Sequence, residues 1–388
     1  MQKLSTDQAA ALTAIGKWLK AQNEQYLTLG GYAGTGKTTL MAMLRQILHT
    51  NRPEMKVAFA AYTGKAALVL KKRLKEAKIL QAKDSVSTLH SLMYNRKERK
   101  DGGVYWEKRE EIKCDLLIID EASMVNEDIW QDALSFAKPI LAVGDHGQLP
   151  PINSDFNLMA EPALRLDKIW RQAADSPIIQ LATLARTTGN IPIGDYSYTV
   201  RKLDRTNSET GDVIEEILHS HDNDTMVLCG YNNTRLRLNS HVRQLKGFES
   251  PEPTRNDVVV CLRNNHESGL VNGQLGTIDA ITPANDDKEG IWWYMVANFD
   301  GQRFEGYTPR EQFNTPITMS RTPKRDKGDQ IGLFDFGYGL TVHKAQGSQA
   351  RRVLVFEERF SQMSEADWRR WLYTAVTRAE EELYIIGS

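Results

Sequence analysis

Two short segments carry residues whose types and spacing suit phosphate chemistry. The first, residues 31–38, reads Gly-Tyr-Ala-Gly-Thr-Gly-Lys-Thr and follows a short apolar stretch, residues 26–29. A G-x-x-x-x-G-K-[ST] loop between a strand and a helix points backbone N–H groups and the helix N-terminus at phosphate oxygens. The pattern predicts a nucleotide-phosphate loop whose binding residues are Gly34, Thr35, Gly36, Lys37, Thr38 and Thr39.

The second segment, residues 116–123, is an apolar run that ends in two acids, Asp120 and Glu121. Continuous apolar runs are typical of buried parallel strands, whose carboxyl ends carry function. We expect Thr38 and Asp120 to hold Mg²⁺. Lys37 would neutralise β/γ-phosphate charge, and Glu121 would polarise the attacking water. The alternative is that the two acids simply end a strand in water.

The elements that must position these residues are visible as alternating patterns. Apolar runs alternate with helical patterns at residues 57–61 and 65–77, then at 116–120 and 127–136, before a further apolar run at 139–143. This alternation predicts an α/β fold with a parallel sheet and helices on both faces. Similar patterns at 226–245 and 352–386 predict a second α/β unit. Short β-like runs between 258 and 307 predict an inserted small β-barrel.

Composition limits the classes of protein that fit. The chain has 388 residues, enough for two or three domains, and a formal net charge of −1, so any nucleic-acid binding must use a local groove. Its three cysteines are far apart in the sequence, which favours neither a disulfide framework nor a zinc site and fits a reducing cytosol. No stretch approaches the length of a membrane span, so we expect a soluble protein with no membrane partner.

Five further segments narrow the function. They are residues 61–67, 87–92, 144–151, 341–348 and 372–379. In the third of them Gln148 follows a strand end, where its amide could sense a γ-phosphate. Taken in order with the phosphate loop and the acid pair, these segments resemble the motif series of superfamily 1 helicases. The resemblance is to the RecD-like and Dda-like branch of superfamily 1B, it covers nearly the whole chain, and the compact layout is similar to that of phage Dda-type helicases.

The resemblance implies two RecA-like P-loop domains with an inserted β-hairpin and an inserted small SH3-like β-barrel. The predicted boundaries are residues 1–92 and 113–165 for domain 1A, 93–112 for the hairpin domain 1B, 166–250 and 335–388 for domain 2A, and 251–334 for the SH3-like domain 2B. The family places ATP between the two RecA-like domains and single-stranded nucleic acid across both.

Roles for single residues also follow from the resemblance. Arg171 and Arg378 match positions that stabilise γ-phosphate charge, and Gln8 sits where the family keeps its adenine-reading glutamine. The expected contacts to nucleic-acid phosphates are Thr63, Lys65, His90, Thr341, His343 and Lys344. Trp106 of the hairpin would be a stacking wedge that separates strands. The competing interpretations are interdomain ion pairs for the arginines, structural roles for the histidines, a helix-surface position for Gln8 and packing at the hairpin base for Trp106.

The resemblance implies an ATP-dependent DNA helicase that translocates 5′ to 3′ on single-stranded DNA and unwinds duplex DNA. Its cofactors would be ATP and Mg²⁺, and its partners single-stranded and forked DNA with a single-strand-binding or replication protein. We expect a monomer in the cytoplasm of a bacterial or phage-infected cell, acting in replication, recombination or repair. Two alternatives stay open: an RNA-directed helicase, and a nucleotide switch or scaffold that does not hydrolyse ATP.

Overall fold

The computed structural model describes residues 4–98, 104–151, 156–169, 175–263, 265, 268–270, 272–287, 289–299, 301–323, 325 and 329–388. The chain divides into two compact units. The first unit comprises Met1–Lys97, Trp106–Gly189 and Arg369–Thr377, and the second comprises Glu98–Tyr105, Asn190–Trp368 and Arg378–Ser388. The domain boundaries expected from the sequence stay predictions.

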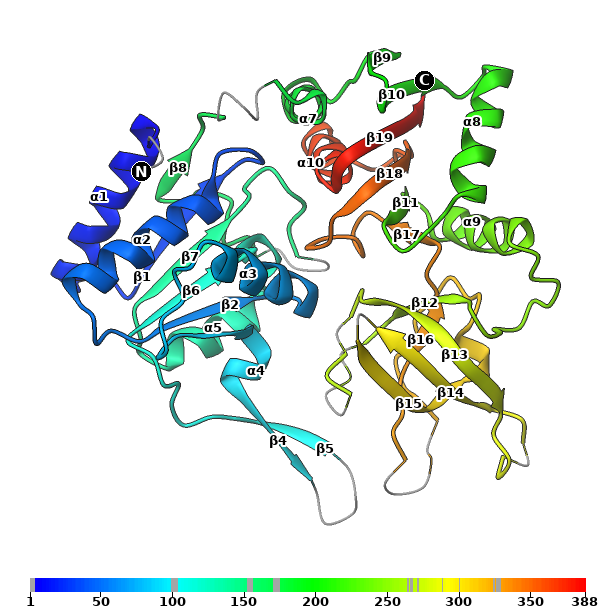
Figure 1. Ribbon diagram of the computed structural model, residues 1–388, viewed down its shortest axis with the longest axis horizontal. Helices are drawn as coiled ribbons and strands as arrows, with labels where there is room; N and C mark the ends of the chain where they lie inside the picture. The colour runs from blue at the N-terminus through cyan, green and yellow to red at the C-terminus, as the bar shows by residue number, and fades with distance from the viewer. Residues whose placement is uncertain are drawn as a thin grey trace. The chain divides into compact units, whose positions relative to one another are not determined.

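A six-stranded parallel sheet forms the first unit, with the strand order β3-β2-β6-β7-β1-β8 (Figure 1). Its strands are β1 (Tyr26–Gly31), β2 (Val57–Ala61), β3 (Ser85–Thr88), β6 (Leu116–Asp120), β7 (Ile140–Gly144) and β8 (Leu164–Leu166). Its helices are α1 (Thr6–Ala21), α2 (Lys37–Asn51), α3 (Gly64–Glu76), α4 (Leu89–Met93), η1 (Ala122–Met124), α5 (Glu127–Ser135) and α7 (Pro177–Thr188). The sheet and its helices confirm the predicted α/β class.

The pleat of these strands divides the apolar residues between two cores. Ile118 of β6 packs with α1, α2 and α3, whereas its neighbours Leu117 and Ile119 pack with α4 and α5. Successive side chains of a strand point to opposite faces, so a run that is apolar throughout needs helices on both faces. Several helices begin after a residue whose side chain caps them. Asn126, for example, accepts a hydrogen bond from Ile129 N at 3.1 Å and starts α5.

The second unit contains another six-stranded sheet, in the order β17-β11-β18-β19-β10-β9. Its strands are β9 (Gly194–Ser197), β10 (Val200–Asp204), β11 (Thr225–Cys229), β17 (Gly339–Thr341), β18 (Ala350–Phe356) and β19 (Ala379–Gly387), and only β9 pairs antiparallel. The helices in this part of the chain are α8 (Ser208–His219), α9 (Asn232–Leu245) and α10 (Glu365–Val376). Apolar side chains of α8 and α9 pack on β11, β18 and β19.

A five-stranded antiparallel sheet is inserted between α9 and β17, in the order β15-β14-β13-β12-β16 (Figure 1). Its elements are β12 (Val258–Cys261), β13 (Leu275–Pro283), β14 (Trp292–Phe299), β15 (Gln302–Pro309), η2 (Arg310–Gln312) and β16 (Phe334–Phe336). Phe299, Phe304 and Phe334 contribute to its apolar core. The insertion is consistent with the predicted small β-barrel.

A two-stranded hairpin follows α4 in the chain. Its strands are β4 (Tyr94–Glu98) and β5 (Val104–Lys108), and Figure 1 shows them extending from the end of α4. An ion pair joins Lys97 to Glu107 across the hairpin. This element lies where the sequence predicted a small inserted hairpin.

All three cysteines, Cys114, Cys229 and Cys261, are buried and unbridged. Burial is the main cause that raises their thiol pKa values, to about 11 for Cys114 and to about 12 for Cys229 and Cys261. At neutral pH these side chains are therefore protonated and act as small apolar groups.

A buried ion pair lies directly before the first strand of the inserted sheet. Arg243 of α9 donates to Asp257 through Nε at 2.8 Å and through Nη2 at 3.0 Å. Asp257 also accepts hydrogen bonds from Thr254 N at 2.8 Å and from the Tyr338 hydroxyl at 2.9 Å. Since Arg243 is 4 % exposed and Asp257 is fully buried, removing one charge would leave the other without compensation.

We therefore expect Asp257→Ala to lower the free energy of unfolding by about 3–5 kcal/mol. The control is Asp195→Ala, which removes the partner of Arg201 from an ion pair whose aspartate side chain is 64 % exposed. That exposed pair should contribute less than about 1 kcal/mol. Denaturant unfolding followed by circular dichroism measures both variants, and equal effects would contradict the structural role assigned to Asp257.

Candidate functional site

Glycine sets the shape of the phosphate loop between β1 and α2. Gly34 and Gly36 have φ angles of +78° and +80°, in the left-handed region that favours glycine. Gly36 is the N-cap of α2, so no side chain at this position occupies the backbone N–H groups of the first turn. The predicted residues Thr38 and Thr39 lie in the first turn of α2, next to backbone N–H groups that an anion can use.

Lys37 begins α2, and backbone carbonyls hold its ammonium group. Nζ donates to Gly31 O at 2.6 Å and to Tyr32 O at 3.2 Å. It also lies 3.7 Å from Oδ2 of Asp145, the residue that follows β7. A Cβ at Gly31 would lie 2.7 Å from Thr35 Oγ1 and 3.1 Å from Leu166 Cβ, so a side chain at this position would force its neighbours to shift. Phosphate oxygens could replace the acceptors that now surround Lys37.

The acid pair ends β6 at the same carboxyl edge of the sheet. β7 lies between β6 and β1, so Asp120 and Glu121 share this edge with the phosphate loop. Burial, and then the negative charge of Glu121, raises the pKa of Asp120 to about 6. Glu121 has a φ of +52°, which is uncommon for a residue with a side chain. Strained backbone of this kind is concentrated at functional sites.

Asp145 and Gln148 follow β7 and are buried. The Asp145 carboxylate accepts hydrogen bonds from Gly147 N at 3.0 Å, from Gln148 Nε2 at 3.4 Å and from the Tyr373 hydroxyl at 2.7 Å. Among the described residues, Gln148 Oε1 has no hydrogen-bond partner. The predicted sensing amide therefore has a free acceptor next to a well-connected carboxylate.

Gln8 has both ends of its carboxamide engaged. Nε2 donates to Thr35 O in the phosphate loop at 3.0 Å, and Oε1 accepts from Ser5 N at 3.2 Å. Ser5 Oγ in turn accepts from Gln8 N, which completes a capping box at the start of α1. Gln8 thus links the first helix to the phosphate loop, and its adenine-reading role stays a prediction.

The nucleic-acid candidates of the first unit lie on α3, α4 and the hairpin. Thr63 Oγ1 accepts from Ala66 N at 3.2 Å and caps α3. The His90 ring stacks on Tyr94 at 4.4 Å and meets Trp106 edge-on at 4.7 Å. Burial lowers the pKa of His90. The structure thus brings His90 and Trp106 together at the hairpin base, while the Lys65 side chain lies outside the described residues.

The candidates of the second unit lie at the end of β17 and directly after it. Thr341, His343 and Lys344 lie in a tight turn in which Lys344 N donates to Thr341 O at 2.9 Å. Burial lowers the pKa of His343. Burial is also the main cause that lowers the pKa of Lys344 to about 8, and the positive charge of Arg235 adds to it.

The two arginines expected to stabilise γ-phosphate charge are Arg378 and Arg171. Arg378 is 3 % exposed, directly precedes β19, and donates through Nη1 to Ser348 O at 3.0 Å. Arg171 lies outside the described residues. Both roles stay predictions.

Sequence reasoning assigned no role to Asp145 or Tyr373, although both lie inside motif segments. The Tyr373 hydroxyl accepts from Ala33 N at 2.7 Å as well as donating to Asp145. Next to it, Arg186 of α7 lies 3.9 Å above the Tyr32 ring. Only the positions within the motifs could have pointed to these contacts, because their partners are distant in the sequence.

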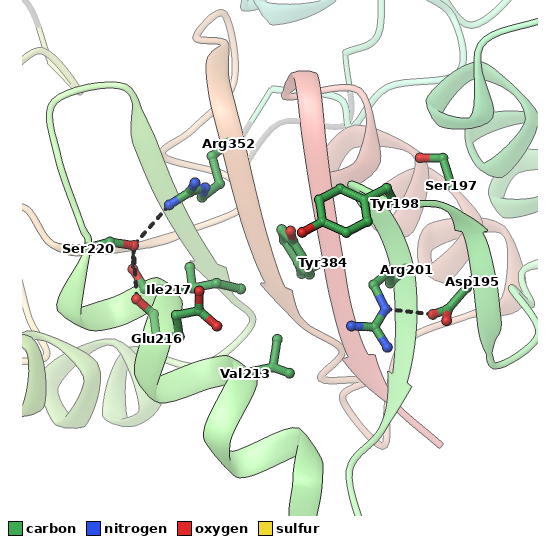
Figure 2. Close-up of a pocket in the computed structure, with 10 residues that line it drawn as sticks. All are labelled: Asp195, Ser197, Tyr198, Arg201, Val213, Glu216, Ile217, Ser220, Arg352 and Tyr384. Carbon is green, nitrogen blue, oxygen red and sulfur yellow. Dashed lines mark hydrogen bonds and ion pairs between the residues drawn. The ribbon is translucent and has the colours of Figure 1, made fainter.

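A separate cavity of about 780 Å³ lies in the second unit, between α8 and the strands β9, β10, β18 and β19 (Figure 2). Within it Arg201 pairs with Asp195 at 2.6 Å, and Arg352 donates to Ser220 Oγ at 2.9 Å. None of its ten lining residues is a predicted site residue. In the described part of the chain, no helix is both long and apolar enough to span a membrane.

Two protein families match this chain. The family described as "AAA domain" matches residues 3–208, and the family described as "UvrD-like helicase C-terminal domain" matches residues 336–386. The first match covers more than half of the chain.

Curated relatives extend the similarity to the whole chain. The ATP-dependent RecD2 DNA helicase of Deinococcus radiodurans is 28% identical over 404 aligned positions, which cover 99% of this chain and 49% of the relative. The ATP-dependent DNA helicase dda of Enterobacteria phage T4 is 29% identical over 196 positions, covering 47% of this chain and 42% of the relative. This chain therefore spans about half the length of the first relative, and its match to the second covers less than half of either protein.

A solved structure of similar fold is that of a Bacteroides Pif1 helicase in complex with ADP-AlF3 and single-stranded DNA. It has a TM-score of 0.53 at 17% sequence identity and covers 99% of this chain and 92% of its own. A structure of two Pif1 helicases at forked double-stranded DNA has the same TM-score at 19% identity, with the same coverage. The likeness establishes a Pif1-like α/β fold.

The link between Gln8 and the phosphate loop can be tested by stability. We expect Gln8→Ala to lower the free energy of unfolding by about 1–2 kcal/mol, since it removes a capping box and a buried hydrogen bond. Thr13→Ala on the same helix removes only an exposed hydroxyl that bonds Ala9 O, and it should change stability by less than about 0.5 kcal/mol. Denaturant titration compares the two, and a Gln8→Ala variant as stable as Thr13→Ala would refute the linking role.

Proposed function

Because this chain belongs to the AAA-domain family and is a RecD-like member of superfamily 1B, we propose that it is an ATP-dependent DNA helicase. It would bind and hydrolyse ATP, translocate 5′ to 3′ along single-stranded DNA and unwind duplex DNA. The polarity follows from the resemblance alone.

One observation carries the proposal. The phosphate loop, the acid pair and Gln148 lie at the carboxyl ends of three neighbouring strands, β1, β6 and β7. Ligands of open α/β sheets bind at such an edge. A cation, two acids and an amide at one edge are the groups that nucleoside triphosphate hydrolysis needs.

The residues of this edge divide the chemistry. Lys37 would leave its backbone carbonyls and neutralise phosphate charge. Glu121 would orient the attacking water and accept its proton, and Gln148 would sense the γ-phosphate by donating a hydrogen bond from Nε2. Arg378 and Arg171 would stabilise the charge that develops as the phosphoryl group leaves.

The residues present fit Mg²⁺. In the described residues no cluster of three or more His, Cys, Asp or Glu side chains forms a metal cage. Mg²⁺ prefers one or two protein oxygens together with phosphates and waters, so Thr38 and Asp120 suffice. Asp120, poorly solvated beside Glu121, gains from a divalent cation. When bound, the ion would neutralise phosphate charge.

DNA binding would rest on phosphate contacts and stacking. Thr63, His90, Thr341, His343, Lys344 and Lys65 would contact the backbone, which gives affinity that is independent of sequence and weakens with salt. Trp106, half-buried against His90, would be the wedge. We further propose a cytoplasmic monomer that works with a single-strand-binding or replication protein.

The test is the rate of ATP hydrolysis with and without single-stranded DNA, beside the unwinding of forked duplexes that carry a 5′ or a 3′ tail. We expect strong stimulation by DNA and unwinding that requires the 5′ tail.

Glu121→Gln should lower the stimulated kcat by about 10²–10⁴-fold. Lys37→Ala should also abolish stimulated hydrolysis. The control is Glu127→Gln, which changes an exposed residue of α5 and should retain full activity. Full activity of Glu121→Gln would remove its water-activating role, and stimulation by RNA alone would redirect the proposal to RNA.

The lowered pKa of Lys344 predicts how DNA affinity depends on pH. Arg235, Asp335 and Cys261 are the charged and titratable groups around it, and its pKa in the free protein is about 8. A DNA phosphate favours the protonated amine, so affinity is complete below pH 8 and falls as pH rises through 8, by at most about tenfold per pH unit. Lys344→Arg keeps its charge and should remove this dependence, as fluorescence anisotropy at constant salt would measure. An identical pH profile for both proteins would exclude Lys344 from the contact.

A further inference from the structure

Tyr373 holds two groups of the phosphate site together through one hydroxyl. The segment Arg369–Thr377 of the chain belongs to the first compact unit, although it is far from the phosphate loop in sequence. Its Tyr373 hydroxyl accepts a hydrogen bond from Ala33 N at 2.7 Å and donates one to Asp145 Oδ2, also at 2.7 Å. The side chain is 1 % exposed, and burial raises its pKa well above the ordinary value, so the hydroxyl stays protonated.

A second hydrogen bond joins the same two segments. Thr374 Oγ1 accepts from Leu149 N at 3.0 Å, inside the segment that contains Asp145 and Gln148. The Tyr373 ring also closes over Gly147, where a Cβ would lie 3.0 Å from Cε1 of Tyr373 and 3.0 Å from Cε1 of Tyr32. Two consecutive residues of α10 therefore fix the loop that follows β7.

Asp145 Oδ2 is shared between Tyr373 and Lys37. Oδ2 lies 2.7 Å from the Tyr373 hydroxyl and 3.7 Å from Lys37 Nζ. Lys37 is the group that would move to the nucleotide phosphates, so Asp145 must then depend on its remaining donors. A buried carboxylate that loses a charged partner needs those hydrogen bonds more.

We propose that Tyr373 is a positioning residue of the ATP site, whose hydroxyl compensates Asp145 when Lys37 turns to phosphate and so couples nucleotide binding to the segment Arg369–Thr377. This inference rests on the proposed function. The proposal gives the ATP site a further residue, Tyr373, that need not touch the nucleotide. Tyr373 connects the phosphate loop to the segment Arg369–Thr377, which ends directly before Arg378.

The direction of the effect follows from comparing the two states. In the free protein, Lys37 can compensate Asp145 when the Tyr373 hydroxyl is missing. In the nucleotide-bound protein Lys37 is engaged elsewhere, so the missing hydroxyl costs more in that state. Removing the hydroxyl should therefore weaken nucleotide binding. The loss is about tenfold if the bound state loses about half of the free energy that a hydrogen bond to a charged group contributes.

The test uses Tyr373→Phe, which keeps the ring and removes only the hydroxyl. Tyr338→Phe is the matched control, because the Tyr338 hydroxyl also accepts from a backbone N–H, that of Val258, and donates to a buried aspartate, Asp257. Equilibrium binding of a fluorescent non-hydrolysable ATP analogue with Mg²⁺ should weaken about tenfold in Tyr373→Phe and less than twofold in Tyr338→Phe. Thermal unfolding checks that both variants fold. Equal affinities in the two variants would overturn the proposal.

Steady-state kinetics and a double-mutant cycle separate positioning from packing. Tyr373→Phe should raise KM for ATP about tenfold and change kcat less than threefold. In an Asp145→Asn background, which no longer attracts Lys37 by charge, the same substitution should change binding less than twofold. A tenfold effect that persists in this background would overturn the coupling through Asp145. Because binding is measured without hydrolysis, an absence of DNA-stimulated activity in the wild-type protein would refute the proposed function and still leave Tyr373 tested.

Discussion

A buried carboxylate must be compensated, and the phosphate site is built around one, Asp145. Isolated ionised groups are costly to bury, so Asp145 requires donors from several parts of the chain. Gly147 N and Gln148 supply them from its own loop, Lys37 from the phosphate loop and Tyr373 from a segment more than two hundred residues later. Its position therefore fixes the relative positions of Lys37, Gln148 and Tyr373.

The same constraint organises the second unit. Asp257 directly precedes β12 of the inserted sheet, and Asp335 lies in β16, the strand that closes it. Arg243 pairs with Asp257 at 2.8 Å, and Arg235 pairs with Asp335 at 2.7 Å. Both arginines lie on α9 and are buried, so one helix anchors the two ends of the insertion. Such pairs favour one arrangement over its alternatives because a mispaired charge would be left without a partner.

The sequence predicted what depends on local pattern. The apolar runs at residues 57–61 and 116–120 became β2 and β6, and the loop at residues 31–38 links β1 to α2 as its glycines require. The hydrogen-bond partners of single side chains could not be predicted from these local patterns. Nothing near Tyr373 in sequence indicates that its hydroxyl meets Ala33 N, and nothing near Gln8 indicates Thr35 O. These contacts depend on the tertiary fold, which periodicity does not encode, whereas motif spacing located the groups that carry charge.

The burial of the three cysteines has a practical consequence for measuring conformational change in this protein by fluorescence. The thiolate is the form that reacts with maleimides and iodoacetamides, and Cys114, Cys229 and Cys261 are buried with pKa values of about 11, 12 and 12. The three natural cysteines should therefore react only slowly with thiol-directed dyes. One cysteine introduced on the surface of each compact unit would carry the fluorophore pair of an energy-transfer experiment without removal of any native residue, so the core that these thiols fill could stay intact.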